Sequence, residues 1–129
     1  MTPNGNNSIK ALIVDDEPEV VEFLAALMEG MGVTVISAFN GAAAWEQYMI
    51  NSPDIVFCDI YMPRMNGLML MNEIKKHNKN APVVLFTNYS QFRHIADRSE
   101  FTPDFFLEKP LEPRFITELM LKLFPQLRK

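Results

Sequence analysis

Residues 55–67 read Ile-Val-Phe-Cys-Asp-Ile-Tyr-Met-Pro-Arg-Met-Asn-Gly. The stretch begins with a short apolar run that lacks polar alternation, which is typical of a strand buried on both faces. The run ends at Asp59, and the turn-forming residues Pro63 and Asn66-Gly67 follow it. We therefore predict a buried strand that delivers one carboxylate to a loop at its C-terminal end.

The same alternation of apolar runs and helix-period segments extends along the chain in both directions. Strands are predicted over Ile9–Val14, Val33–Ala38, Ile55–Cys58, Val83–Phe86 and Phe105–Leu107. A first helix is predicted from Pro18 to the stop signals Gly30 and Gly32, and a second over Ala42–Ile50. A third helix is predicted to contain Leu68, Met71 and Ile74 on one face, a fourth to span Gln91–Arg98, and a fifth to begin at Pro113. Five such strands and five helices predict an α/β fold, with a doubly wound parallel sheet covered on both faces.

Composition and charge narrow the class of protein. A chain of 129 residues with 48% hydrophobic and 22% charged residues is typical of one globular domain. A net charge of −4 argues against a generic nucleic-acid or anionic-membrane surface. The single Cys58 allows no internal disulfide, and the polar start lacks the features of a signal peptide. We predict a cytoplasmic protein with a flexible tail over residues 1–8, a domain over 9–126 and a C-terminal end over 127–129.

The predicted strand ends carry residues that suggest a chemistry. Asp15 and Asp16 follow the first strand, Asp59 the third and Thr87 the fourth, and Lys109 follows the fifth. Right-handed crossovers bring the C-terminal ends of all strands to one edge, so these side chains would converge there. Clustered carboxylates repel one another unless a cation lies among them, and Mg²⁺ prefers oxygen ligands. An ion held there could bridge to phosphoryl oxygens, and the lysine and the hydroxyl could hold the others.

The ordered set of motifs resembles the response-regulator receiver family of two-component signalling. An acidic pair reads Val14-Asp15-Asp16-Glu17-Pro18, a central aspartate opens the stretch Asp59–Gly67, and Thr87 and Lys109-Pro110 follow in order. The likeness covers about Ile9–Phe124. It implies a flavodoxin-like sheet with strand order 2-1-3-4-5.

The resemblance also implies a metal site and a modification site. Asp59 would be the phosphoacceptor, modified to an aspartyl phosphate. Asp16, Asp59 and the backbone carbonyl of Tyr61 would ligate Mg²⁺, with Mn²⁺ as an alternative, while Asp15 would act through a bound water.

Further roles and partners follow from the same resemblance. Thr87 and Lys109 would contact the phosphoryl group, and Thr87 and Phe106 would form a conformational switch. The donor would be a histidine kinase or a histidine phosphotransfer protein. A downstream target or a second copy would meet the face formed by the fourth helix, fifth strand and fifth helix, without direct contact to nucleic acid or membrane. The chain would catalyse only its own phosphorylation and dephosphorylation, as a stand-alone receiver or a piece of a longer protein.

Several positions depart from the family pattern or suggest a surface. Asn88 stands where the family mostly has a smaller residue, and Pro103 precedes the fifth strand. The rings of Tyr61 and Tyr89 are predicted either to screen the phosphoryl group from water or to swing outward. An apolar partner surface is predicted from Phe92, Phe101, Phe105, Leu111 and Leu121.

Other functions compete with this interpretation. Taken singly, Asp15-Asp16 could be a helix-start cluster and Asp59 a loop residue. An aspartate-nucleophile phosphohydrolase usually has a second acidic residue where Tyr61 stands, and Asp15-Asp16 would repel the phosphate of a flavin. A receiver-fold interaction module that works without phosphorylation stays open because of Asn88 and Pro103. His77 and His94 are predicted to face solvent and receive no role.

Overall fold

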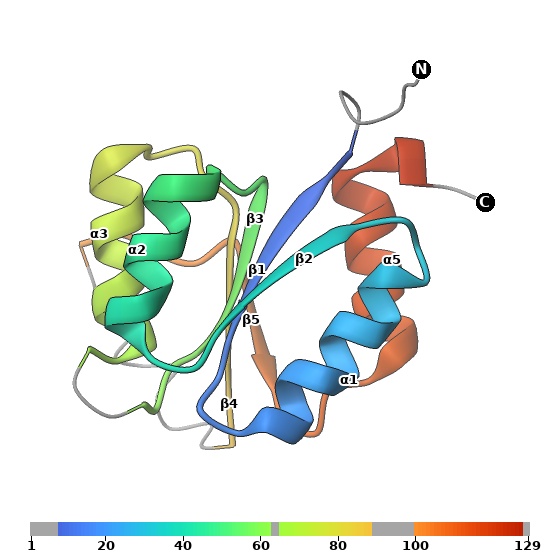
Figure 1. The fold of residues 1–129 in the computed structure, drawn as a ribbon, viewed down its shortest axis with the longest axis horizontal. Helices are drawn as coiled ribbons and strands as arrows, with labels where there is room; N and C mark the ends of the chain where they lie inside the picture. The colour runs from blue at the N-terminus through green and yellow to red at the C-terminus, as the bar shows by residue number, and fades with distance from the viewer. Residues whose placement is uncertain (1–7, 63–64, 89–99, 128–129) are drawn as a thin grey trace.

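The computed structural model of the chain describes residues 8–62, 65–88 and 100–127, and its centre is a five-stranded parallel sheet (Figure 1). The strands are β1 (Lys10–Val14), β2 (Thr34–Ala38), β3 (Ile55–Asp59), β4 (Val83–Thr87) and β5 (Phe105–Glu108). They lie in the order β2-β1-β3-β4-β5. The predicted sheet and its strand order are confirmed.

Helices cover both faces of this sheet. The described residues form α1 (Pro18–Glu29), α2 (Gly41–Asn51), α3 (Gly67–His77), α5 (Pro113–Leu123) and the 3₁₀ turn η2 (Pro125–Leu127). Figure 1 shows α2 and α3 on one face and α1 and α5 on the other. The helix predicted over Gln91–Arg98 lies outside the described residues. None of the helices in the described ranges is long and apolar enough to cross a membrane.

The helix starts follow from local chemistry. α1 and α5 each begin with a proline, whose fixed φ suits the first turn. α2 and α3 begin after asparagines: the Asn40 side chain accepts the Ala43 N–H at 2.8 Å, and the Asn66 side chain accepts the Met69 N–H at 2.9 Å. Asn66 is therefore a helix cap, and Gly67 is the first helical residue instead of part of a turn.

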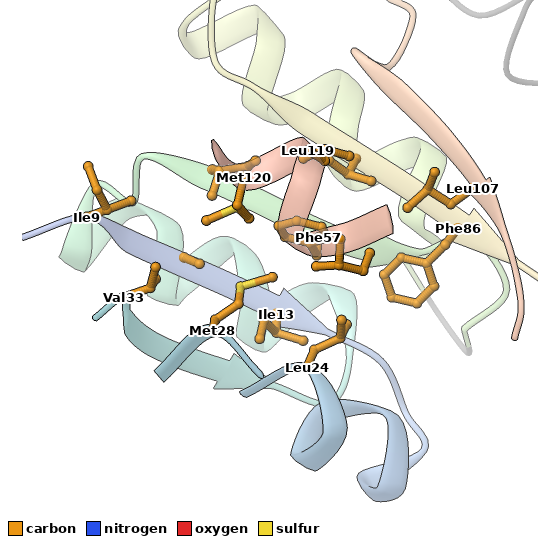
Figure 2. Close-up of a cluster of buried hydrophobic side chains, with 14 of the residues drawn as sticks. Ile9, Ile13, Leu24, Met28, Val33, Phe57, Phe86, Leu107, Leu119 and Met120 are labelled. Atoms are coloured by element: carbon orange, nitrogen blue, oxygen red, sulfur yellow. The ribbon is translucent and has the colours of Figure 1, made fainter. Parts of the chain in front are cut away.

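Two hydrophobic cores lie on opposite faces of the sheet, because neighbouring strand residues point to opposite sides. Figure 2 shows the core beneath α1 and α5, where Ile13, Phe57 and Phe86 meet Leu24 and Met120. The other core, beneath α2 and α3, contains the alternate strand residues and their helix partners Leu12, Val56, Leu85, Leu70 and Ile74. β1, β3 and β4 each contribute to both cores, which makes them the interior of the molecule.

The predicted apolar surface is wrong for its described members. Phe101, Phe105, Leu111 and Leu121 are half-buried and pack against the two cores. Their partial burial follows from the alternation of β5 residues between the two faces and from the packing of α5 on one face. Phe92 lies outside the described residues, whereas Phe115 on α5, which was not predicted, is 58% exposed.

Candidate functional site

Three aspartates converge at the C-terminal edge of the sheet. Asp15, Asp16 and Asp59 each offer a carboxylate oxygen, and these oxygens all lie within 4.8 Å of one another. Asp15 follows β1 and Asp59 ends β3, and β1 pairs directly with β3 through Val14 and Cys58. Asp15 and Asp59 are buried, whereas Asp16 is exposed. The pairing of β1 with β3 is therefore what brings the predicted carboxylates together.

Lys109 supplies a cation to this cluster. Its ammonium lies 2.9 Å from Asp15 Oδ2, 3.0 Å from Glu17 Oε1 and 3.5 Å from Asp59 Oδ2. The backbone N–H of Lys109 donates to the carbonyl of Thr87 at 2.8 Å, which fixes the residue beside the end of β4. The side chain is only 8% exposed. Lys109 is thus an interior counter-ion shared by three carboxylates.

The protonation equilibria at the site reflect this crowding. Burial, together with the charge of Asp15, raises the pKa of Asp59 to about 6 even though Lys109 lowers it. Burial also raises the pKa of Asp15, against the opposing effect of Lys109. Burial alone would lower the pKa of Lys109, but its contacts with Asp15, Glu17 and Asp59 raise it above its usual value. The carboxylates therefore remain short of positive charge when ionised.

The residues present fit a hard divalent cation. Asp15 Oδ1 accepts the Glu17 N–H at 2.9 Å. Asp15 Oδ2 is buried and, within the described part of the chain, has no hydrogen-bond partner, although the Lys109 ammonium lies 2.9 Å away as a counter-ion. An oxygen-only donor set with an unsatisfied buried carboxylate oxygen is the environment that Mg²⁺ favours.

A pocket opens beside the cluster. Its volume is about 230 Å³, and it is lined by Asp16, Glu17, Asp59, Tyr61, Thr87 and Asn88. Thr87 is fully buried at the end of β4, next to the strand that carries Asp59. The Tyr61 backbone N–H donates to Asp59 Oδ1 at 3.4 Å, while the Tyr61 residue is 65% exposed. Tyr89, its predicted screening partner, lies outside the described residues.

The start of α3 fixes the backbone on which Asp59 sits. The Gly67 N–H donates to the Ile60 carbonyl at 2.9 Å, so the helix begins directly against the end of β3. A Cβ atom added at Gly67 would overlap the Asp59 carbonyl oxygen and approach the Ile60 Cα to 2.9 Å. Glycine is therefore the residue that permits this approach.

The remaining candidates lie around this site or away from it. Phe106 pairs with Leu85 across β4 and β5 and is half-buried against the core beneath α2 and α3. Cys58 is buried, and burial raises the pKa of its thiol, as expected for an inert small hydrophobe. His77 is exposed and meets the Trp45 ring edge-on, away from the carboxylates. His94 lies outside the described residues.

Sequence reasoning missed the contact between Glu17 and Lys109. The ion pair joins residues 92 positions apart. The sequence shows Glu17 directly after the aspartate pair, but it does not show that the Glu17 side chain turns toward Lys109.

Comparison with known proteins identifies relatives over most of the chain. The sequence matches the family described as response regulator receiver domain over residues 11–121. It is 34% identical over 107 residues to the transcriptional regulatory protein ZraR of Escherichia coli K12, covering 83% of this chain and 24% of that protein. It is 33% identical over 101 residues to the regulator of RpoS of the same organism, covering 78% of this chain and 30% of that protein. The chain thus spans less than a third of these relatives.

Solved structures have the same fold. The response regulator TrrA from Thermotoga maritima, solved in complex with Mg²⁺-BeF, has a TM-score of 0.82 and 33% identity and covers 90% of this chain and 99% of its own. The receiver domain of NtrX from Brucella abortus has a TM-score of 0.79 and 27% identity, over 89% and 98% of the two chains. By its sequence, its fold and the aspartate cluster at the sheet edge, the chain belongs to the response regulator receiver family, the signalling domains of two-component systems.

Proposed function

We propose that the chain accepts a phosphoryl group on Asp59 in a two-component or phosphorelay pathway. One observation carries the proposal: the Asp59 carboxylate lies in an open pocket, within 4.8 Å of the Asp15 and Asp16 oxygens and 3.5 Å from the Lys109 ammonium. A nucleophilic oxygen, a cation site and a fixed ammonium are the parts that phosphoryl transfer requires.

The chemistry would run through the Asp59 carboxylate. One oxygen attacks phosphorus, and the bond to the donor's leaving group breaks with its electron pair. From a phosphohistidine the leaving group is the imidazole nitrogen, which takes up a proton; from acetyl phosphate it is acetate. A pKa of about 6 leaves Asp59 mostly ionised at neutral pH and therefore nucleophilic. Lys109 and the Thr87 hydroxyl would hold the phosphoryl oxygens.

A divalent cation would share in this step. Asp16, Asp59 and the Tyr61 carbonyl would hold Mg²⁺ or Mn²⁺, and Asp15 would act through a bound water. The buried Asp15 Oδ2 supports this assignment, because it accepts no hydrogen bond within the described residues and lies beside Lys109 only as an ion pair. When bound, the ion would supply positive charge to the transferring phosphoryl group.

Partners and output are part of the proposal. The donor would be a histidine kinase or a histidine phosphotransfer protein, in the cytoplasm. Phosphorylation would act through Thr87 and Phe106 on the surface of β5 and α5, which would meet a protein target or a second copy. The chain would turn over no external substrate. Because relatives include a transcriptional regulatory protein of which this chain covers 24%, the absence of direct nucleic-acid contact stays a prediction.

The test is phosphoryl uptake by wild type and Asp59→Asn. With Mg²⁺ and acetyl phosphate, intact-mass spectrometry should show an acid-labile phosphate on wild type and none on the variant, because an amide is nearly isosteric but not nucleophilic. Asp54→Asn, at the exposed opposite end of β3, is the matched control and should be phosphorylated normally. Acid-labile phosphate on Asp59→Asn would refute the assignment. No uptake by wild type would favour a phosphorylation-independent interaction module.

A further inference from the structure

Glu17 stands apart from the other carboxylates that face Lys109. Its Oε1 lies 3.0 Å from the ammonium, closer than Asp59 Oδ2 at 3.5 Å. Its side chain is 55% exposed, whereas those of Asp15 and Asp59 are 0% and 7% exposed. The lysine is therefore held by two buried carboxylates at the sheet edge and by one exposed carboxylate, that of Glu17.

The backbone position of Glu17 explains how its carboxylate reaches the lysine. Glu17 is the residue that precedes the first turn of α1, a position where the side chains of Asp, Asn, Ser and Thr commonly cap the helix. Its side chain makes no such capping bond. Its backbone is fixed instead, because its N–H donates to Asp15 Oδ1 at 2.9 Å and its carbonyl accepts the Val20 N–H at 3.1 Å. The Glu17 carboxylate therefore does not cap its own helix and instead contacts Lys109.

We propose that Glu17 is a positioning residue that holds Lys109 in the unphosphorylated site and releases it to the phosphoryl group. This inference rests on the proposed function, in which Lys109 binds phosphoryl oxygens on Asp59. Before transfer, Glu17 occupies one donor of the ammonium and adds a negative charge beside Asp15, Asp16 and Asp59. An incoming phosphate anion must therefore displace Glu17, and phosphorylation is slower than the other residues alone would allow.

Because the Glu17 side chain is exposed, its contact with Lys109 is the one that a phosphoryl group can replace. Asp15 is buried and would be left without a counter-ion if Lys109 withdrew from it. A half-exposed carboxylate can turn into water at small cost, since such pairs are weak. The expected consequence of removing it is accordingly moderate, about a two- to fivefold change in rate.

The experiment compares Glu17→Gln and Glu17→Ala with Glu19→Gln. Glu19 lies in the same first turn of α1 and lines the groove beside Lys109, but no ion pair joins it to Lys109 in the described residues, so its variant removes the same charge without the contact. With saturating Mg²⁺ and varied acetyl phosphate, both Glu17 variants should be phosphorylated about two- to fivefold faster. The gain should appear as a lower half-saturating acetyl phosphate concentration and should shrink at high salt. Glu19→Gln should match wild type.

A second measurement follows the lysine directly in the metal-free, unphosphorylated protein. The ¹⁵N-labelled Lys109 ammonium should exchange its protons with water faster in Glu17→Gln than in wild type or Glu19→Gln. Adding Mg²⁺ and beryllium fluoride should slow this exchange to the same level in all three proteins, because the phosphoryl mimic takes the place of Glu17.

The outcomes separate this inference from the proposed function. Equal rates and equal ammonium exchange in Glu17→Gln and Glu19→Gln would overturn the role of Glu17 while leaving Asp59 as the acceptor. Weaker Mg²⁺ binding by Glu17→Gln in calorimetry would also overturn it, because Glu17 would then act on the metal. No phosphate uptake by wild type would remove the proposed function, and this inference with it.

Discussion

Ionisation of the Asp59 side chain makes the carboxylate nucleophilic, as the proposed function requires, but lowers the stability of the folded protein. Its pKa of about 6, against an ordinary value of 3.8, means that ionised Asp59 opposes folding by roughly 3 kcal/mol. Because the folded state binds the proton more tightly than the unfolded state, the stability of the metal-free protein should rise as pH falls from about 6 toward 4. Asp15, whose pKa is also raised, acts in the same direction. The carboxylate proposed as the phosphoacceptor is thus ionised at neutral pH, and its ionisation lowers the stability of the fold.

Asp59→Asn should therefore stabilise the metal-free protein at neutral pH, by up to roughly 3 kcal/mol. The gain should shrink as pH falls toward 4, where wild-type Asp59 is protonated in the fold. Urea unfolding at several pH values with a chelator present measures it, with Asp54→Asn as the control that should follow wild type. If the free energy of unfolding of Asp59→Asn differed from that of wild type by the same amount at every pH, the raised pKa of Asp59 could not be the cause.

Single residues also show what the sequence could and could not predict. Asp15, Asp59 and Thr87 were predictable as neighbours because Asp15 directly follows a strand and Asp59 and Thr87 each end one, and parallel strands end at one edge. The contact between Glu17 and Lys109 was not, since it depends on side-chain directions across 92 positions of sequence. Asp16 was expected in the cluster and lies there, but its exposure could not be read from its position after β1.

The junction between β3 and α3 depends on one glycine. Gly67→Ala should lower the free energy of unfolding by about 1–3 kcal/mol, because its Cβ would overlap the Asp59 carbonyl and force the backbone apart. It should also slow phosphorylation by displacing Asp59. Chemical denaturation and acetyl phosphate kinetics measure the two effects.

Gly30→Ala is the matched control for that junction. Gly30 has a right-handed helical φ of −63°, and an added Cβ would meet nothing closer than 3.4 Å. This variant should be neutral or slightly more stable, by up to about 1 kcal/mol. If both alanine variants were equally stable, the close approach at Gly67 would have no energetic consequence.

A second contact joins α3 to the N-terminal ends of β4 and β5, on the side of the sheet away from the aspartates. Asp104 Oδ2 accepts from Lys75 Nζ and from the Val83 N–H, both at 2.8 Å, and the Lys75 side chain is only 6% exposed. Asp104→Ala should lower the free energy of unfolding by about 1–3 kcal/mol, because the nearly buried ammonium loses its partner. The phosphorylation rate of the folded variant should be unchanged, since the pair lies at the N-terminal end of β4.

Asp104→Asn refines that comparison. Its amide oxygen can still accept the Val83 N–H, so its unfolding midpoint in urea should fall between those of wild type and Asp104→Ala. An Asp104→Ala midpoint equal to that of wild type would show that the contact adds no stability.

Among the elements, the strands were more predictable from the sequence than the helices and side chains that pack on them. Short, mostly apolar runs located β1, β3 and β4 closely, because a strand buried on both faces tolerates few polar residues. Asn66-Gly67 was interpreted as a turn, since a capping asparagine and a turn asparagine look alike in sequence. The half-buried Phe101 and Phe105 were interpreted as surface, because sequence does not show how far each ring packs between the cores.

For the whole molecule, Mg²⁺ should act as a stabilising ligand. Binding would relieve the repulsion among the aspartates and should raise the melting temperature, by an amount equivalent to about 2.7 kcal/mol when free Mg²⁺ is a hundred times its Kd. Asp16→Asn should lose most of this gain, whereas Asp54→Asn should keep it. Differential scanning calorimetry with and without millimolar Mg²⁺ measures the shift. A wild-type melting temperature indifferent to Mg²⁺ would exclude the metal site.

The sheet order has a consequence for how the site can open. The carboxylates of Asp15 and Asp59 are attached to β1 and β3, interior strands whose backbones are covered on both sides, whereas Lys109 is attached to the edge strand β5. Amide hydrogens of Ile13 and Phe57 should exchange with deuterium only through global unfolding, and those of β5 through cheaper, subglobal opening. The backbone that carries the two buried carboxylates should therefore be more rigid than the backbone that carries Lys109.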